Sequence, residues 1–201
     1  MALIVPPRVP PPAERGGEVR NEPWDGWYQR ELGWATAGGS PVRLLTGLRF
    51  DALVVPAVAG HAALRRVGRT GPVALAGLRM SLLVAPGSAE ELPGLLDWLE
   101  WGGVALSLSC LGAGGRITAP PPPGRPVPPG AASWLRPPGP SREQDEAPAL
   151  PAFSGFGSRR GGAPDLVRLV DAVATECHRA RLTRARAGVL PEGPAQPLAF
   201  S

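Results

Sequence analysis

The chain has 201 residues, 43% of them hydrophobic, which is enough to bury the core of one domain. The formal net charge of +4 is mild and does not demand a nucleic-acid partner, and no apolar run approaches the roughly 20 residues that span a bilayer. The composition therefore gives no sign of a membrane protein. The two distant cysteines, Cys110 and Cys177, provide no disulfide framework and indicate a reducing, cytoplasmic compartment.

Arginine, glycine and proline dominate the composition. All 21 basic residues are Arg, which a GC-rich genome explains better than selection for guanidinium groups. Gly and Pro number 27 each, which predicts long irregular stretches. The charge is unevenly spread, with six Arg and one acid from Arg43 to Arg79 but four acids and no base from Glu90 to Glu100. The first stretch could attract phosphate, or it could be an ordinary solvated surface.

The composition along the chain predicts five segments. Residues 1–23 are rich in Pro and charge, and we expect disorder or polyproline II there. A folded domain is predicted over residues 24–136, and a low-complexity linker over residues 137–163. Residues 164–187 are expected to form a separate amphipathic helix, and residues 188–201 a disordered tail.

Aromatic residues open the predicted domain. Trp24, Trp27 and Tyr28 share one helix face through their i, i+3, i+4 spacing. This face could stack nucleic-acid bases, or it could dock the N-terminal segment onto the core.

The middle of the domain mixes short strands with helices. A buried strand at Leu53–Val55 ends at Pro56 and precedes a helix over residues 59–67. A capping box at Ser88–Glu91 predicts a second helix, with Trp98 continuing its inner face. Further strands are predicted over residues 73–75, 80–84, 104–108, 116–119 and 131–135. This order has no repeated βαβ rhythm, so we predict an α+β fold in which a sheet packs against helices.

The last predicted helix combines an apolar stripe with a basic end. Pro164 and Asp165 suit its first turn. Its final turns carry Arg179, Arg181, Arg184 and Arg186. This end could contact phosphate or an acidic partner, or it could simply be solvated.

No motif for catalysis or metal binding is visible. The glycine cluster Gly112–Gly115 lacks the pattern of a phosphate-binding loop, and a hairpin turn explains it better. His61 and His178 lie in no catalytic motif, and their spacing from the cysteines does not suit zinc. We therefore expect no metal and no other cofactor.

Several short motifs between residues 42 and 136 nevertheless follow the order typical of one enzyme family. They are Thr46-Gly47, the strand Leu53–Val55, Gly77-Leu78-Arg79-Met80, the run from Gly114 to Pro121, and Trp134. This stretch resembles the primase–polymerase domain at the N-terminus of bifunctional DNA primase/polymerases, of the archaeo-eukaryotic primase superfamily. The resemblance implies an α+β domain that handles DNA and nucleotides.

The catalytic residues of that family are not retained. The resemblance implies paired acids that hold two divalent metals, Mg²⁺ or Mn²⁺. The positions of the family's acids and of its nucleotide-contacting His are occupied here by Val54, Pro56, Met80 and Ser107, or Ser109 in place of Ser107. Asp51 is the only possible substitute nearby, and strand alternation puts it on the face opposite Val54.

The first hypothesis is therefore a catalytically degenerate primase–polymerase-like domain that binds nucleic acid, a nucleotide or a protein. The phosphate contacts that we predict for it are Arg49, Arg65, Arg66, Arg79 and Arg116.

Two alternatives remain open. One is an active primase that uses Asp51, with Asp97 or Glu100, as substitute metal ligands. The other is a protein-interaction adaptor that binds its partner through the proline tracts and the helix over residues 164–187.

Overall fold

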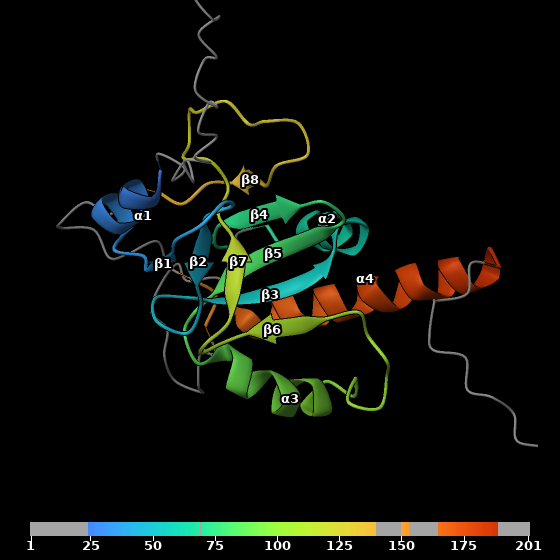
Figure 1. Cartoon of the computed structure of the whole chain (residues 1–201). Coiled ribbons are helices and arrows are strands. Elements are labelled where there is room, and N and C mark those ends of the chain that lie inside the picture. The colour runs from blue at the N-terminus through green and yellow to red at the C-terminus, as the bar shows by residue number, and fades with distance from the viewer. Residues whose placement is uncertain (1–23, 69, 140–149, 153–164, 189–201) are drawn as a thin grey trace, which may run out of the picture.

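Figure 1 shows the computed structural model, which describes residues 24–68, 70–139, 150–152 and 165–188. The helices of these parts are α1 (Asp25–Leu32), α2 (Ala57–Leu64), α3 (Ser88–Trp98) and α4 (Leu166–Arg186). The strands are β1 (Thr36–Ala37), β2 (Arg43–Leu45), β3 (Asp51–Pro56), β4 (Val73–Ala76), β5 (Arg79–Val84), β6 (Ser109–Leu111), β7 (Arg116–Thr118) and β8 (Ser133–Arg136). The predicted α+β class is confirmed. The predictions for residues 1–23, for most of 137–163 and for 189–201 lie outside the described residues.

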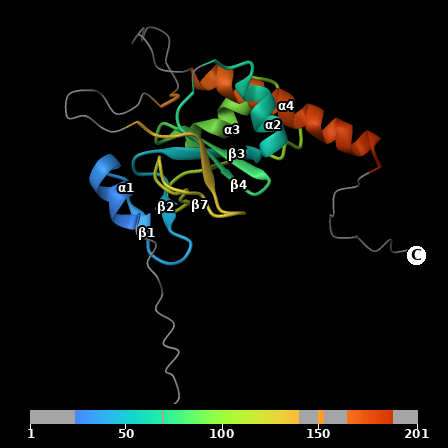
Figure 2. The same cartoon turned by 90° about the horizontal axis from the view of Figure 1, so that it is seen from above.

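The strands form two antiparallel sheets. The larger sheet has the strand order β6-β3-β5-β4-β8, and the smaller one has the order β1-β2-β7. Seen from above, α2, α3 and α4 lie on one side of the larger sheet, and the smaller sheet lies with α1 on the other (Figure 2). The larger sheet is therefore the middle of three layers.

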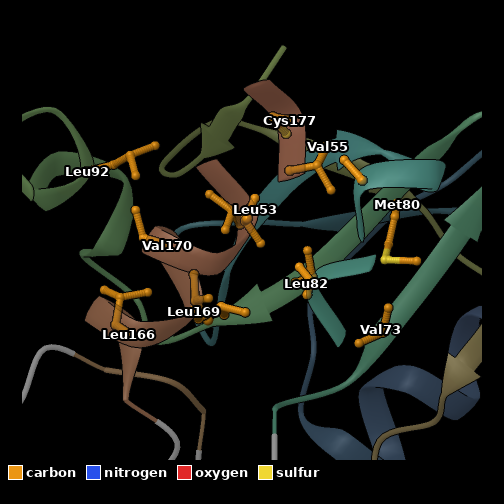
Figure 3. Close-up of a cluster of buried hydrophobic side chains, with 14 of the residues drawn as sticks. Leu53, Val55, Val73, Met80, Leu82, Leu92, Leu166, Leu169, Val170 and Cys177 are labelled. Atoms are coloured by element: carbon orange, nitrogen blue, oxygen red, sulfur yellow. The ribbon is translucent and has the colours of Figure 1, made fainter. Parts of the chain in front are cut away.

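The first core lies between the larger sheet and its helices. Leu53, Val55, Met80 and Leu82 project from β3 and β5 toward the helices, and Leu169 of α4 packs against them (Figure 3). All five side chains are at most 1% exposed. The helix predicted to be separate therefore completes the core of this domain. Asp165, predicted to lie in the first turn of this helix, is its N-cap residue and accepts a hydrogen bond from the Val167 amide at 2.9 Å.

The second core is aromatic and lies on the other side of the larger sheet. Tyr28 of α1 is fully buried, and Trp34 lies between Tyr28 and Phe50, with ring centroids 6.1 and 4.7 Å away. The Tyr28 hydroxyl donates to the Pro120 carbonyl and accepts from Trp134 Nε1. Burial raises the pKa of Tyr28, so the hydroxyl keeps its proton and remains a donor. Tyr28 therefore docks α1 onto the core.

Helix α3 begins and ends differently from its prediction. Ser88 does not form the predicted capping box, because its hydroxyl donates to the Ala85 carbonyl at 2.7 Å. Asp51, from β3, instead accepts a hydrogen bond from the Ala89 amide at 2.9 Å. At the other end Trp98 is 69% exposed, so it does not continue the inner face as predicted.

The strand predicted over residues 104–108 is not formed. This stretch is irregular, and β6 begins only at Ser109. Its carbonyl groups accept from arginine side chains rather than from a neighbouring strand, since Arg181 donates to Ala105 and Arg79 to Ser107. The alternation of apolar residues reflects partial burial here, not strand pairing.

Candidate nucleic-acid interface

The larger sheet turns one face away from the helices, and the smaller sheet covers only part of it. Strand pairing places Val54 opposite Ser81 and Ser109, and Pro56 opposite Arg79, all on this face. In Figure 1 the smaller sheet crosses one half of the larger sheet, and β3, β4 and β5 extend beyond it. We call this uncovered half the open face.

The face of the larger sheet that turns away from the helices carries some of the positions that the family resemblance singles out. Val54 and Pro56 are on this face, where the resemblance would place metal-binding acids, but Val54 packs against the aromatic core and Pro56 is buried. Met80 points the other way, into the core, and Arg79 and Ser81 are the β5 residues that share the face with Val54. Ser107 lies exposed in the irregular stretch before β6. The structure therefore does not bring Met80 together with Val54 and Pro56.

Arg79 places a positive charge at the end of β3. Its Nη2 donates to the Val54 carbonyl at 3.3 Å and its Nη1 to the Ser107 carbonyl at 3.5 Å. The residue is nonetheless exposed. A guanidinium has five donors, so Arg79 keeps hydrogen-bonding capacity for a ligand.

The C-terminal end of α4 lies close to Arg79. Arg181 of α4 donates to the Ala105 carbonyl at 2.7 Å, and Arg79 donates to the Ser107 carbonyl two residues later, so the two residues meet the same short stretch of chain. Burial raises the pKa of the Cys177 thiol to about 11, and the positive charges of Arg79 and Arg184 oppose this rise. Every residue from Arg181 to Arg186 is exposed, and this end of the helix projects past the sheets (Figure 1). Among the described residues, the hydrogen bond from Arg181 to the Ala105 carbonyl ties this end to the rest of the domain, and the guanidinium groups of Arg184 and Arg186 lie exposed beyond it.

Two further arginines follow the end of α2. Arg65 donates to the His61 carbonyl, and Arg66 pairs with Glu176 of α4 at 3.1 Å. Glu176 is 8% exposed and also accepts from Arg179 at 2.9 Å. Two guanidinium groups around one carboxylate leave a net positive charge.

The arginines after α2, Arg79 and the arginines at the C-terminal end of α4 are joined in pairs, by Glu176 and by the stretch over residues 104–108, and we call them together the basic surface. Its members are Arg65, Arg66, Arg79, Arg179, Arg181, Arg184 and Arg186.

Arg49 and Arg116 do not belong to this group. Arg116 lies in β7, opposite Leu45 of the smaller sheet, and the guanidinium of Arg49 lies beside Gly33 at the end of α1. Of the five arginines predicted to contact phosphate, three thus gather with α4 and two lie in another layer. The arginines of α4 were identified in the sequence as a basic end, but no local signal connects them with Arg79.

Asp51 has a structural role at the N-terminus of α3. It is 0% exposed and lies on the same face as Leu53, opposite Val54, as strand alternation predicts. Its Oδ2 accepts from the Ala89 amide, and a carboxylate is favourable at the positive end of a helix. Asp97 lies eight residues beyond Ala89 on α3, about 12 Å further along the helix. The substitute metal ligands considered above are therefore not brought together.

Replacing Asp51 by Ala is expected to lower the free energy of unfolding by about 2 kcal/mol, because the Ala89 amide loses its acceptor. Urea denaturation measures this change. The exposed residue Asp97 offers a control, since Asp97→Ala should change stability by less than about 0.5 kcal/mol. Equal effects of the two substitutions would contradict the capping role.

Neither cysteine is an activated nucleophile. Both thiols are free, and burial, together with the negative charges of Asp51 and Glu90, raises the pKa of Cys110 to about 12. Cys177 likewise stays protonated at neutral pH. Within the described parts of the chain, no three His, Cys, Asp or Glu side chains lie together as metal ligands would.

No helix in the described residues has the length and apolar character needed to cross a membrane. Comparison of the sequence with protein-family models and with curated proteins, and of the structure with solved structures, found no match.

Proposed function

We propose that this chain is a primase–polymerase-like domain that binds the phosphates of nucleic acid without carrying out polymerisation. The observation that carries the proposal is the basic surface, where Arg181, in the exposed turns of α4, and Arg79 donate to two carbonyls of the same stretch, those of Ala105 and Ser107. Its one acid, Glu176, is buried and already paired. Incoming phosphate would therefore meet guanidinium groups with little local repulsion.

The chemistry of arginine supports this assignment. The C-terminal turns of α4 carry four arginines, Arg179, Arg181, Arg184 and Arg186, and the acids Glu90 and Glu91 lie in the first turn of another helix, α3. Arginine is suited to phosphate because its planar group donates two parallel hydrogen bonds. A negatively charged polymer would be attracted by this local excess of arginine although the net charge is only +4.

The chemistry of the open face favours binding over catalysis. A two-metal polymerase needs carboxylates on the strand that carries Val54 and Pro56, and those side chains are apolar. The hydroxyls of Ser81 and Ser109 are weak ligands for Mg²⁺ or Mn²⁺ but are suitable donors to phosphate. We accordingly propose a non-catalytic DNA- or RNA-binding protein that acts in the cytoplasm.

Fluorescence anisotropy with a labelled single-stranded oligonucleotide tests the proposal. We expect a dissociation constant in the range of roughly 1–100 μM at low salt, weakening steeply as salt is added. Absence of binding at 100 μM protein would remove the nucleic-acid assignment and leave the protein-adaptor alternative. Primer synthesis by this chain with Mn²⁺ would contradict the non-catalytic part.

A further inference from the structure

Exposed apolar side chains gather at the tip of the β4–β5 hairpin. Gly77 and Leu78 form its two-residue turn, in which Gly77 takes a φ of 56° and Leu78 is 87% exposed. The Leu78 carbonyl accepts a hydrogen bond from the Ala57 amide at 2.8 Å, which joins this tip to the start of α2. Val58, the next residue of α2, is 64% exposed. Two exposed aliphatic residues joined in this way form a patch, unlike the single apolar residues scattered over ordinary surfaces.

The patch continues along α2 to the basic surface. Val58, His61 and Arg65 are all exposed and follow the i, i+3, i+7 spacing of one helix face. We call Val58, His61 and Leu78 the tip patch. Arg79 follows Leu78 directly, so the tip patch borders the basic surface through Arg65 on the helix and through Arg79 on the sheet.

The chain around the tip patch carries no acid. The sequence has no Asp or Glu from Ala52 to Ala89, a range that includes all of α2, β4 and β5. The acid of α4 that reaches the end of α2 is Glu176, and it is already paired with Arg66 and Arg179. A ligand at the tip patch therefore meets apolar side chains beside uncompensated positive charge.

We propose that the tip patch is a nucleobase site, at which an unpaired base of a bound single strand lies against Leu78, Val58 and the His61 ring. The inference rests on the proposed function, because the phosphates of that strand would be held by the neighbouring arginines. Each nucleotide combines a negative phosphate with a flat base, and this surface combines guanidinium groups with aliphatic and imidazole groups. Histidine rings stack on unpaired bases, and leucine side chains contact base faces where a stack is opened.

A bilayer suits the tip patch less well. Leu78 and Val58 together have about half as many side-chain carbons as a myristoyl chain, which on its own gives only marginal membrane binding. A base requires only one apolar face to lie against, so a patch of this size is sufficient for it.

Fluorescence anisotropy with two labelled strands of equal length, oligothymidine and an abasic strand, tests the proposal. The two strands carry the same phosphates, so we expect equal salt slopes but about tenfold tighter binding of oligothymidine by the unaltered protein. Equal affinities would overturn the base site and leave the phosphate assignment standing. Absence of binding to either strand at about 100 μM protein would remove both.

Substitutions locate the site. Leu78→Ser combined with Val58→Ser should weaken binding of oligothymidine about tenfold and leave binding of the abasic strand unchanged. The matched control is Leu48→Ser with Val127→Ser, which alters residues that are 64% and 48% exposed. Leu48 precedes β3 and Val58 follows it, so the two lie at opposite ends of that strand.

Three results with these variants would overturn the proposal. The first is an equal loss of oligothymidine binding from both pairs of substitutions. The second is an equal loss of binding to the two strands from the Leu78 and Val58 pair. The third is sedimentation with phosphatidylserine vesicles that this pair abolishes while oligothymidine binding is unchanged, which would identify a membrane as the occupant.

Discussion

Replacing Arg184 and Arg186 together by Glu is expected to weaken binding to single-stranded DNA by roughly 50-fold at about 50 mM salt. Each phosphate contact on a single strand releases about 0.7 of a counterion, which corresponds to about an eightfold gain in affinity at this salt concentration. Both residues lie in exposed turns of α4, so their substitution should not disturb the core. The slope of log affinity against log salt should also fall in magnitude by about 1.4.

The matched control is Arg43→Glu with Arg168→Glu. This pair makes the same change in net charge at exposed positions on β2 and on the N-terminal half of α4, outside the basic surface. We expect its effect on affinity to stay within about threefold, because long-range charge is screened over about 10 Å. Anisotropy measurements that gave equal losses for both pairs would attribute binding to net charge and not to the basic surface.

Leu169→Ala should lower the free energy of unfolding by about 3–4 kcal/mol. Leu169 is 0% exposed and packs from α4 against the larger sheet, so truncation leaves a cavity in the first core. For a protein of this size, the melting temperature should fall by about 10 °C. Calorimetry or thermal circular dichroism measures this shift.

Leu182→Ala is the companion substitution on the same helix. Leu182 is 43% exposed and lies beyond the part of α4 that packs in the core, so we expect less than about 0.5 kcal/mol of change. A similar small effect at Leu169 would mean that α4 folds separately from the sheet, as its sequence alone suggested.

Sequence patterns correctly predicted the elements whose structure is determined by residues close together in the sequence. The apolar run of β3 marks a strand buried on both faces, and Pro56 marks its end. The apolar stripe of α4 and its Asp165 cap likewise act within a few residues. The alternation that placed Asp51 and Val54 on opposite faces is also local, and it proved correct.

The failures involve partners that are distant in the sequence. The stretch over residues 104–108 has the apolar alternation of a strand, but Arg79 and Arg181 take up two of its backbone carbonyls. The capping box predicted at Ser88 does not form, because the Ser88 hydroxyl donates to Ala85 and the carboxylate of Asp51, from β3, accepts from the first turn of α3 instead. Propensity describes the chain near a residue and carries no information about such long-range donors and acceptors.

The candidate site was predicted in part for the same reason. Arg65, Arg66 and Arg79 fall in one acid-poor stretch of the chain, which composition reveals. Their proximity to α4 depends on how that helix crosses the sheet. The ion pair between Arg66 and Glu176 of α4 is an example of a contact that this crossing creates. Arg49 belongs to the same stretch of sequence, but the turn before β3 carries it to another layer.

The hydrogen bonds from Arg79 and Arg181 to backbone carbonyls have a thermodynamic consequence for recognition. A long, freely rotating side chain loses roughly 0.5–1.5 kcal/mol of rotamer entropy when a ligand immobilises it. These two guanidinium groups are already held by Val54, Ser107 and Ala105 as the chain folds. Much of that loss occurs before any ligand arrives, so this part of the surface is preorganised for association.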